Sequence, residues 1–107
     1  MSLRARLAQW VGLGGDKIRV RVILKGRMGT GWYDVDEHIA LEPGATLASL
    51  LDVAERRGIR LREAIAHSPH LRHTLMWNGE RAPLEENLTR TLQDGDQIYL
   101  LGPLAGG

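Results

Sequence analysis

The residues best suited to chemistry lie at the C-terminal end of the chain, which reads Pro103, Leu104, Ala105, Gly106 and Gly107. Two glycines without side chains leave a thin strip of backbone that carries a carboxylate, and this strip can enter a slot that excludes any Cβ atom. Gly102 and Pro103 mark the expected end of the folded body. If residues 103–107 are extended, they place the carboxylate roughly 15 Å or more beyond this body. The alternative is an unimportant frayed end.

Three histidines suggest a metal site, at positions 67, 70 and 73. Pro69 interrupts any helix that would bring them onto one face, and the chain has no Cys to join them. Structural zinc sites are usually built from Cys and His together. The sequence therefore favours solvated or capping histidines, and we expect no metal.

Asp94 and Asp96 are spaced as a pair of carboxylates that could exchange protons with a substrate. Gly95 stands between them, and Asp–Gly pairs are typical of turns. We therefore expect a structural turn at this position rather than an acid/base pair.

Composition limits the class of protein. A chain of 107 residues with 43% hydrophobic and 25% charged residues is expected to form one globular domain. The net charge of +1 gives no reason to expect direct binding of nucleic acid. Because the chain has no Cys, disulfides and thiolate catalysis are excluded. No apolar run approaches a membrane span or a secretory signal, so we expect a cytoplasmic protein without membrane contact.

Residues 1–16 are expected to form a separate extension. One apolar stripe of a short helix over residues 2–11 is made by Leu3, Leu7, Trp10 and Val11. The glycines that follow it predict a flexible hinge. The stripe is expected to pack on the domain or to mediate self-association with a second copy. Docking on a partner protein or a membrane surface is the alternative.

The first half of the expected domain, residues 17–102, predicts a hairpin and a helix. Apolar and polar residues alternate over 18–24 and again over 32–41, which is typical of half-buried strands. The glycine-rich stretch 25–31 between them predicts a hairpin loop, followed by an exposed Trp32. Thr46 and Gly58 are typical of the two ends of a helix. A short second helix is expected over residues 61–66.

The second half predicts further strands. Residues 71–77 are expected to form a strand, and Asn78–Gly79 favours a tight turn. Leucines recur every four residues across 83–93, which predicts a helical turn. The last strand is expected over 97–101. This order predicts an α+β sheet with its main helix on one face. The other face would carry a mixed partner surface made of Arg19, Arg21, Ile23, Tyr99 and Leu101.

Four segments of the sequence resemble the MoaD/ThiS family of β-grasp, ubiquitin-like sulfur carriers. They are Glu42–Leu47 at the helix start, Asn78–Glu80 after a strand, Leu92–Asp96 before the last strand and Pro103–Gly107 at the end. The resemblance covers roughly residues 17–107. It implies a mixed β-grasp sheet packed on one main helix, and it implies that Gly107 is the working group with Gly106 as its approach.

A terminal carboxylate has a pKa near 3.5, so at neutral pH it is an anion and a poor acyl donor. The resemblance implies that an E1-like adenylating enzyme uses ATP to convert Gly107 to an acyl-adenylate. A sulfur donor then converts it to a thiocarboxylate, since the chain has no Cys of its own. The chain itself would be a carrier rather than an enzyme and would bind no cofactor.

The sequence does not identify the sulfur acceptor. It is a pterin, a thiazole precursor, an amino-acid precursor or a tRNA base, as in molybdopterin or thiamine biosynthesis, and the chain could be the small subunit of a synthase such as molybdopterin synthase. One alternative is a ubiquitin-like modifier that joins Gly107 to lysines of target proteins. A second alternative is a binding module that performs no conjugation.

Overall fold

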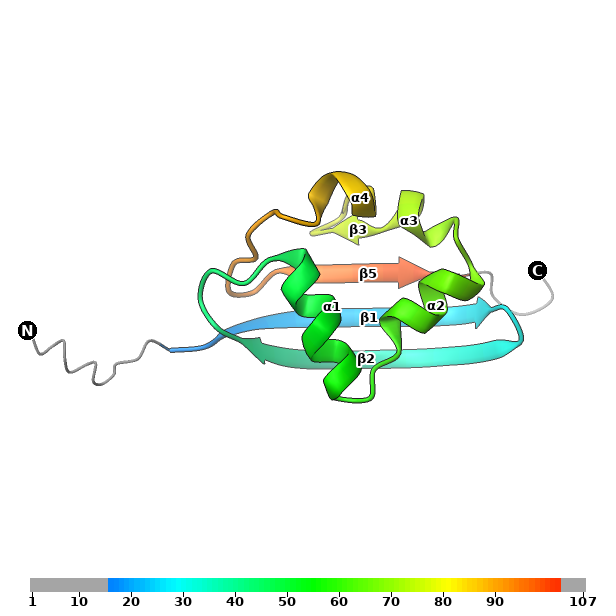
Figure 1. Cartoon of the computed structure of the whole chain (residues 1–107), viewed down its shortest axis with the longest axis horizontal. Coiled ribbons are helices and arrows are strands. Elements are labelled where there is room, and N and C mark those ends of the chain that lie inside the picture. Colours follow the sequence, from blue (N-terminus) through cyan, green and yellow to red (C-terminus); the bar gives the residue numbers. More distant parts are fainter. Residues whose placement is uncertain (1–15, 103–107) are drawn as a thin grey trace, which may run out of the picture.

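The computed structural model describes residues 16–102 (Figure 1). The expected N-terminal helix and the tail residues 103–107 lie outside this range, so both stay predictions. Between residues 16 and 102, no helix is long and apolar enough to cross a membrane.

A long hairpin forms one side of the sheet. Strand β1 (Ile18–Met28) pairs antiparallel with β2 (Gly31–Leu41), with Ile18 opposite Leu41 and Met28 opposite Gly31. The predicted loop over residues 25–31 is therefore wrong, because only Gly29 and Thr30 turn the chain. The ladder continues through the glycine-rich stretch because Met28 is buried at its end and anchors the strand to the core.

The last strand enters the middle of the sheet. Strand β5 (Gln97–Leu101) runs parallel to β1, and the short β3 (Met76–Trp77) pairs antiparallel with β5 on its other side. Strand β4 (Glu80–Arg81) pairs antiparallel with β3 at the edge of the sheet, which gives the order β2-β1-β5-β3-β4. This mixed sheet with helices on one face is the predicted β-grasp α+β fold.

Two helices cross one face of the sheet (Figure 1). Helix α1 (Leu47–Arg56) begins at Thr46, whose Oγ1 accepts a hydrogen bond from the Ser49 N–H at 3.3 Å. Ser49 Oγ accepts from the Thr46 N–H at 3.1 Å, so two free donors of the first turn are satisfied. Gly58 follows the helix with φ of +81°, the left-handed conformation expected at a helix end. Helix α2 (Leu61–His67) comes next, as predicted.

The segment between α2 and β5 differs from the prediction. Residues 71–74 form the short helix α3 (Leu71–Thr74) rather than a strand, and α4 (Leu84–Asn87) occupies only the start of the predicted leucine helix. Leu71 and Leu75 are both buried while His73 is exposed. A spacing of four residues places both leucines on one side of a helical turn, whereas a strand would have buried His73 with them.

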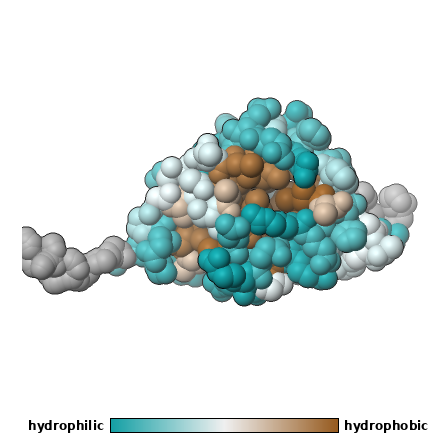
Figure 2. All heavy atoms as spheres, in the orientation of Figure 1, coloured by the Kyte–Doolittle hydropathy of each residue, from teal (hydrophilic) through white to brown (hydrophobic). Residues whose placement is uncertain are grey.

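The core lies between the helices and the sheet face that they cover. Its largest buried side chains come from strands and helices alike: Leu24, Met28, Ile39, Leu47, Leu50, Leu61, Leu71, Leu75, Trp77, Leu92, Ile98 and Leu100. On the helix side some apolar surface stays visible (Figure 2), where Leu51, Ile65, Leu84 and Leu88 line a hollow of about 310 Å³. The opposite side of the sheet, called the open face below, is covered by none of the helices of residues 16–102 (Figure 1).

Candidate functional site

The predicted working residues fall largely outside the described part of the chain. Pro103, Leu104, Ala105, Gly106 and Gly107 are not described, and their roles stay predictions. The structure does describe the residue from which this tail starts. Gly102 directly follows β5, and its N–H donates a hydrogen bond to the carbonyl of Lys25 in β1 at 2.8 Å.

Gly102 is buried against the backbone of β1, where Gly26 faces it. A Cβ atom placed on Gly26 would lie 2.6 Å from the Gly102 carbonyl oxygen. A Cβ atom placed on Gly102 would lie 2.7 Å from the Arg27 carbonyl oxygen. Real Cβ contacts are not this short, so only glycine fits at either position. This close approach fixes the point from which residues 103–107 leave the domain.

This contact was not predicted from the sequence. Gly26 belongs to the glycine-rich stretch that predicted a loop, but it lies inside β1 with φ of +114°. A glycine inside a strand often marks a place where a second backbone comes close. That signal was present in the sequence, although nothing in it identified Gly102 as the partner.

The open face carries four of the five predicted partner residues in neighbouring positions of β1 and β5. Arg21 lies opposite Gln97, Ile23 opposite Tyr99, and Lys25 opposite Leu101. Arg19 precedes them on the same side of β1, since side chains two apart in a strand share a face. The structure thus brings all five predicted residues onto one surface.

These residues differ in how far they reach the solvent. Ile23 is only 6% exposed, although it is not part of the hydrophobic core on the helix side. Leu101, in contrast, is 46% exposed. Trp32, at the hairpin end of the same face, is 57% exposed and pairs across the strands with Arg27. The most accessible apolar groups of the open face therefore lie at the end where β5 leads into the tail.

Two ion pairs cross the open face between β1 and β2. Arg21 donates to both carboxylate oxygens of Asp36, from Nε at 2.8 Å and from Nη2 at 2.6 Å. These hydrogen bonds lower the pKa of Asp36 and raise the pKa of Arg21, so both groups stay charged. Lys25 Nζ lies 3.1 Å from Asp34 Oδ1. Asp34 and Asp36 of β2 are thereby paired, while Arg19 and Arg27 have no ion pair within the described residues.

The other candidate groups have structural roles. In the described part of the chain, no three His, Asp or Glu side chains are close enough together to hold a metal ion. Asp96 is buried and accepts hydrogen bonds from Trp77 Nε1 at 3.1 Å, Asn78 Nδ2 at 2.8 Å and the Gln93 N–H at 2.8 Å. Asp94 accepts from the Arg19 N–H at 2.9 Å. These carboxylates hold turns together, as predicted.

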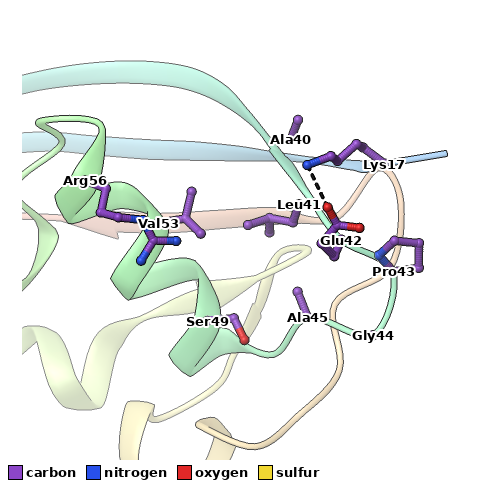
Figure 3. A pocket seen from close by; sticks show the side chains of 10 residues that line it. All are labelled: Lys17, Ala40, Leu41, Glu42, Pro43, Gly44, Ala45, Ser49, Val53 and Arg56. Atoms are coloured by element: carbon purple, nitrogen blue, oxygen red, sulfur yellow. Dashed lines mark ion pairs between the residues drawn. The ribbon is translucent and has the colours of Figure 1, made fainter. Parts of the chain in front are cut away.

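A hollow of about 540 Å³ lies at the far end of the sheet, between α1 and the hairpin strands (Figure 3). Val53 and Arg56 of α1 line one side, and the ion pair between Lys17 and Glu42, at 2.8 Å, lies on the other. Lys17 precedes β1, whereas Gly102 contacts the other end of that strand. The hollow is therefore remote from the tail, and we assign it no part in chemistry at Gly107.

Comparison with known proteins supports the fold and the family. The model of the ThiS family matches residues 20–107. The solution structure of the Haloferax volcanii HVO 2177 protein aligns with a TM-score of 0.55 and 18% identity over 88% of this chain and 91% of that chain. The Caldiarchaeum subterraneum ubiquitin aligns with a TM-score of 0.44 and 15% identity over 85% of this chain and 99% of that chain. No sequence match is found among curated proteins.

Proposed function

The chain belongs to the ThiS family, and from this premise we propose that it is a sulfur carrier that works through the carboxylate of Gly107. Members of this family are small ubiquitin-like carrier proteins rather than enzymes. The observation that carries the proposal is the extent of the family match, which runs through the last strand and both terminal glycines to residue 107. The contact between Gly26 and Gly102 supports it, because it gives the tail a fixed starting point.

The chemistry follows from the carboxylate. An E1-like adenylating partner transfers AMP from ATP to Gly107 and releases pyrophosphate, which turns a poor acyl donor into a good one. Sulfide from a sulfur donor then attacks the carbonyl carbon, and AMP leaves. A donor persulfide attacks in the same way, and a second thiol then cleaves the resulting acyl disulfide, with a disulfide as the by-product. The product is a thiocarboxylate on Gly107. Because the chain has no Cys, the transferred sulfur must come from another protein or from solution.

The open face is the surface proposed for the partner. Trp32 and Leu101 are its most exposed apolar side chains, and both lie near the start of the tail. Large aromatic side chains commonly contribute most of the binding energy at protein interfaces. A partner that binds this patch would hold its ATP site within reach of a five-residue tail, which spans roughly 17 Å when extended.

The acceptor of the sulfur is proposed only as a class. It is a synthase or other enzyme whose substrate takes up sulfur in the making of a cofactor, an amino acid or a modified tRNA. A narrow diglycine end suits delivery of the sulfur into an enclosed acceptor site, because no side chain blocks its entry.

Intact mass spectrometry tests the proposal. The chain is incubated with ATP, Mg²⁺, a sulfide source and an E1-like adenylating enzyme from the same genome. We expect pyrophosphate release and a mass increase equal to the exchange of one oxygen for sulfur, located on Gly107. A chain that lacks Gly106 and Gly107 is the control and should show neither change.

Two results would contradict the carrier function. If the activated chain instead leaves diglycine remnants on lysines of other proteins, it is a protein modifier. If no adenylating enzyme of that genome releases pyrophosphate with the intact chain, Gly107 is not activated at all and the chain is a binding module.

A further inference from the structure

The outer edge of strand β2 is a further interaction surface, and we propose that it binds an extended basic segment of a partner protein as a sixth strand of the sheet. The bound segment lies antiparallel to β2 and carries Lys or Arg at alternate positions, on the open face. This binding does not depend on activation of Gly107, and residues 103–107 take no part in it.

Strand β2 forms a long edge of the sheet (Figure 1). Within residues 16–102 it has a neighbouring strand only on its β1 side, and it is eleven residues long. The opposite edge, β4, has only two residues. Proteins commonly blunt an exposed edge by keeping it short or by placing a bulge, Pro or Lys in it. The register of β2 with β1 has no bulge, and β2 contains neither Pro nor Lys, so it stays a template for another strand.

The backbone groups that face outward from β2 can be identified from β1. The Arg21 N–H donates to the Asp96 carbonyl at 2.9 Å, so Arg21 and every second residue after it direct their backbone groups toward β5. The residues between them, such as Val22, therefore bond to β2, where Val22 lies opposite Glu37. The N–H and C=O groups that point away from the sheet consequently belong to the alternate residues of β2: Trp32, Asp34, Asp36, His38 and Ala40.

Acidic side chains determine which strand can bind there. Asp34 stays 71% exposed despite its ion pair, and Glu37 is exposed as well. Opposite residues of an antiparallel pair share a face, and like charges placed there are destabilising. Two copies of β2 paired about their centres would place Asp36 opposite Asp36, and a shift of two residues would place Asp34 opposite Asp36. A second copy of this chain is therefore a poor occupant, whereas a basic strand meets opposite charges.

The helix side of β2 restricts the basic residues to alternate positions. Arg60 lies on this side, with its Cζ atom 5.2 Å from the centroid of the Tyr33 ring. Val35 is only partly buried there. A small aliphatic side chain beside Val35 would cover it, whereas a cation would approach Arg60. The segment that fits best therefore alternates Lys or Arg with Val or Thr, which are residues favoured in strands.

A synthetic peptide tests this surface. The probe is acetyl-TKVRVKT-amide, whose Arg is expected opposite Asp36 and whose second Val is expected opposite Val35. It is titrated into the ¹⁵N-labelled full chain, and exchange of backbone amides with D₂O is followed by NMR. In the free chain the amides of Asp34, Asp36 and His38 should exchange faster than that of Glu37. At about 90% saturation, exchange of these three should slow about tenfold, because only the free fraction exchanges.

Methylation of the peptide backbone distinguishes strand addition from other modes of binding. The N–H groups of its Lys and Arg residues face β2, whereas those of its Val residues face away. N-methyl groups on the Lys and Arg residues should therefore abolish the protection, and N-methyl groups on the Val residues should leave it in place. A peptide with Glu in place of every Lys and Arg should give no protection.

Two matched variants of the chain test the role of charge. Asp34→Asn should weaken binding of the peptide about two- to fivefold, the range expected for one cross-strand charge pair. Asp52→Asn makes the same change in net charge on α1, where Asp52 pairs with Arg62 at 2.7 Å, and should leave the affinity unaltered. Circular dichroism confirms that both variants are folded.

The proposal fails if the peptide protects none of the outward amides of β2, or if the two methylated peptides bind alike. It also fails if the acidic peptide protects the same amides, or if Asp34→Asn binds as tightly as the wild type. Protection that appears without peptide, as the concentration of the chain is raised, would show that a second copy occupies the edge and would overturn the assignment to a basic partner.

Discussion

Side-chain alternation along β1 and β5 places several residues together on the open face. The alternation predicted that Arg21, Ile23, Tyr99 and Leu101 lie on one side of the sheet, and the strand register agrees. The alternation did not predict how deeply each side chain is buried. Ile23 lies on β1, with cross-strand neighbours on β2 and β5, and is nearly buried, whereas Leu101 is the last residue of its strand and stays exposed. How deeply a side chain is buried depends on its neighbours on adjacent strands, which the sequence of one strand does not specify.

At this scale the sharpest prediction concerns Gly26. An alanine there would meet the Gly102 carbonyl oxygen at 2.6 Å and would also have to adopt φ of +114°. We expect Gly26→Ala to lower the free energy of unfolding by at least about 3 kcal/mol, since strain and backbone overlap add. Urea denaturation measures this loss.

Gly44→Ala is the matched control. Gly44 also has a positive φ, of +92°, but a Cβ atom there would meet nothing within 4 Å. Only the conformational penalty applies, so we expect a loss of about 1–2 kcal/mol. Equal losses in the two variants would show that the approach of Gly102 to β1 is not tight.

At the scale of elements, one buried carboxylate joins two turns. Asp96 lies in the turn before β5, and it accepts hydrogen bonds from Trp77 and Asn78 at the turn between β3 and β4. Arg90 stacks over the Trp77 ring, with its Cζ atom 4.0 Å from the centroid. The short strand β3 is therefore held by side chains as well as by its two residue pairs with β5.

Asp96→Ala should weaken this part of the sheet. It leaves the buried Trp77 N–H and the Gln93 N–H without an acceptor, so we expect a loss of about 3 kcal/mol in unfolding free energy. A shift in tryptophan fluorescence should accompany it. Asp94→Ala, which removes one exposed hydrogen bond to Arg19, should cost about 1 kcal/mol. A cost for Asp94→Ala that matches that of Asp96→Ala would argue against the buried network.

Elements with local signals were predictable from the sequence. Helix α1 has a capping residue and a terminal glycine, and β5 alternates cleanly between its two faces. The failures come from long-range contacts. The extension of β1 through Gly26 depends on residues across the hairpin and on Gly102, and the helical form of residues 71–74 depends on burial of Leu71 and Leu75 together. Of the site, the face was predictable, while the glycine contact at the tail was not.

At the scale of the whole domain, the two ends of the sheet differ in character. One end carries the hollow beside α1 (Figure 3), and the other carries the exposed Trp32 and the start of the tail. The parallel pairing of β1 and β5 produces this arrangement, because both strands end on the same side. A partner that binds at the Trp32 end is the one that can reach residues 103–107.

Trp32→Ala tests the partner surface. We expect the KM of the adenylating enzyme for this chain to rise about tenfold, as for loss of an interface residue of high energy, with kcat little changed. Stability should change little, since Trp32 is 57% exposed. His73→Ala, exposed on α3 away from this surface, should leave KM unaltered. An unchanged KM in Trp32→Ala would place the partner elsewhere.

The parallel alignment of β1 and β5 also has a mechanical consequence. When a partner enzyme or a protease pulls on the tail, the force runs along β5 and across the direction of its hydrogen bonds to β1. The bonds then share the load and break together, in shear, rather than one after another. The strand from which the tail leaves the domain is therefore the strand best placed to resist extraction.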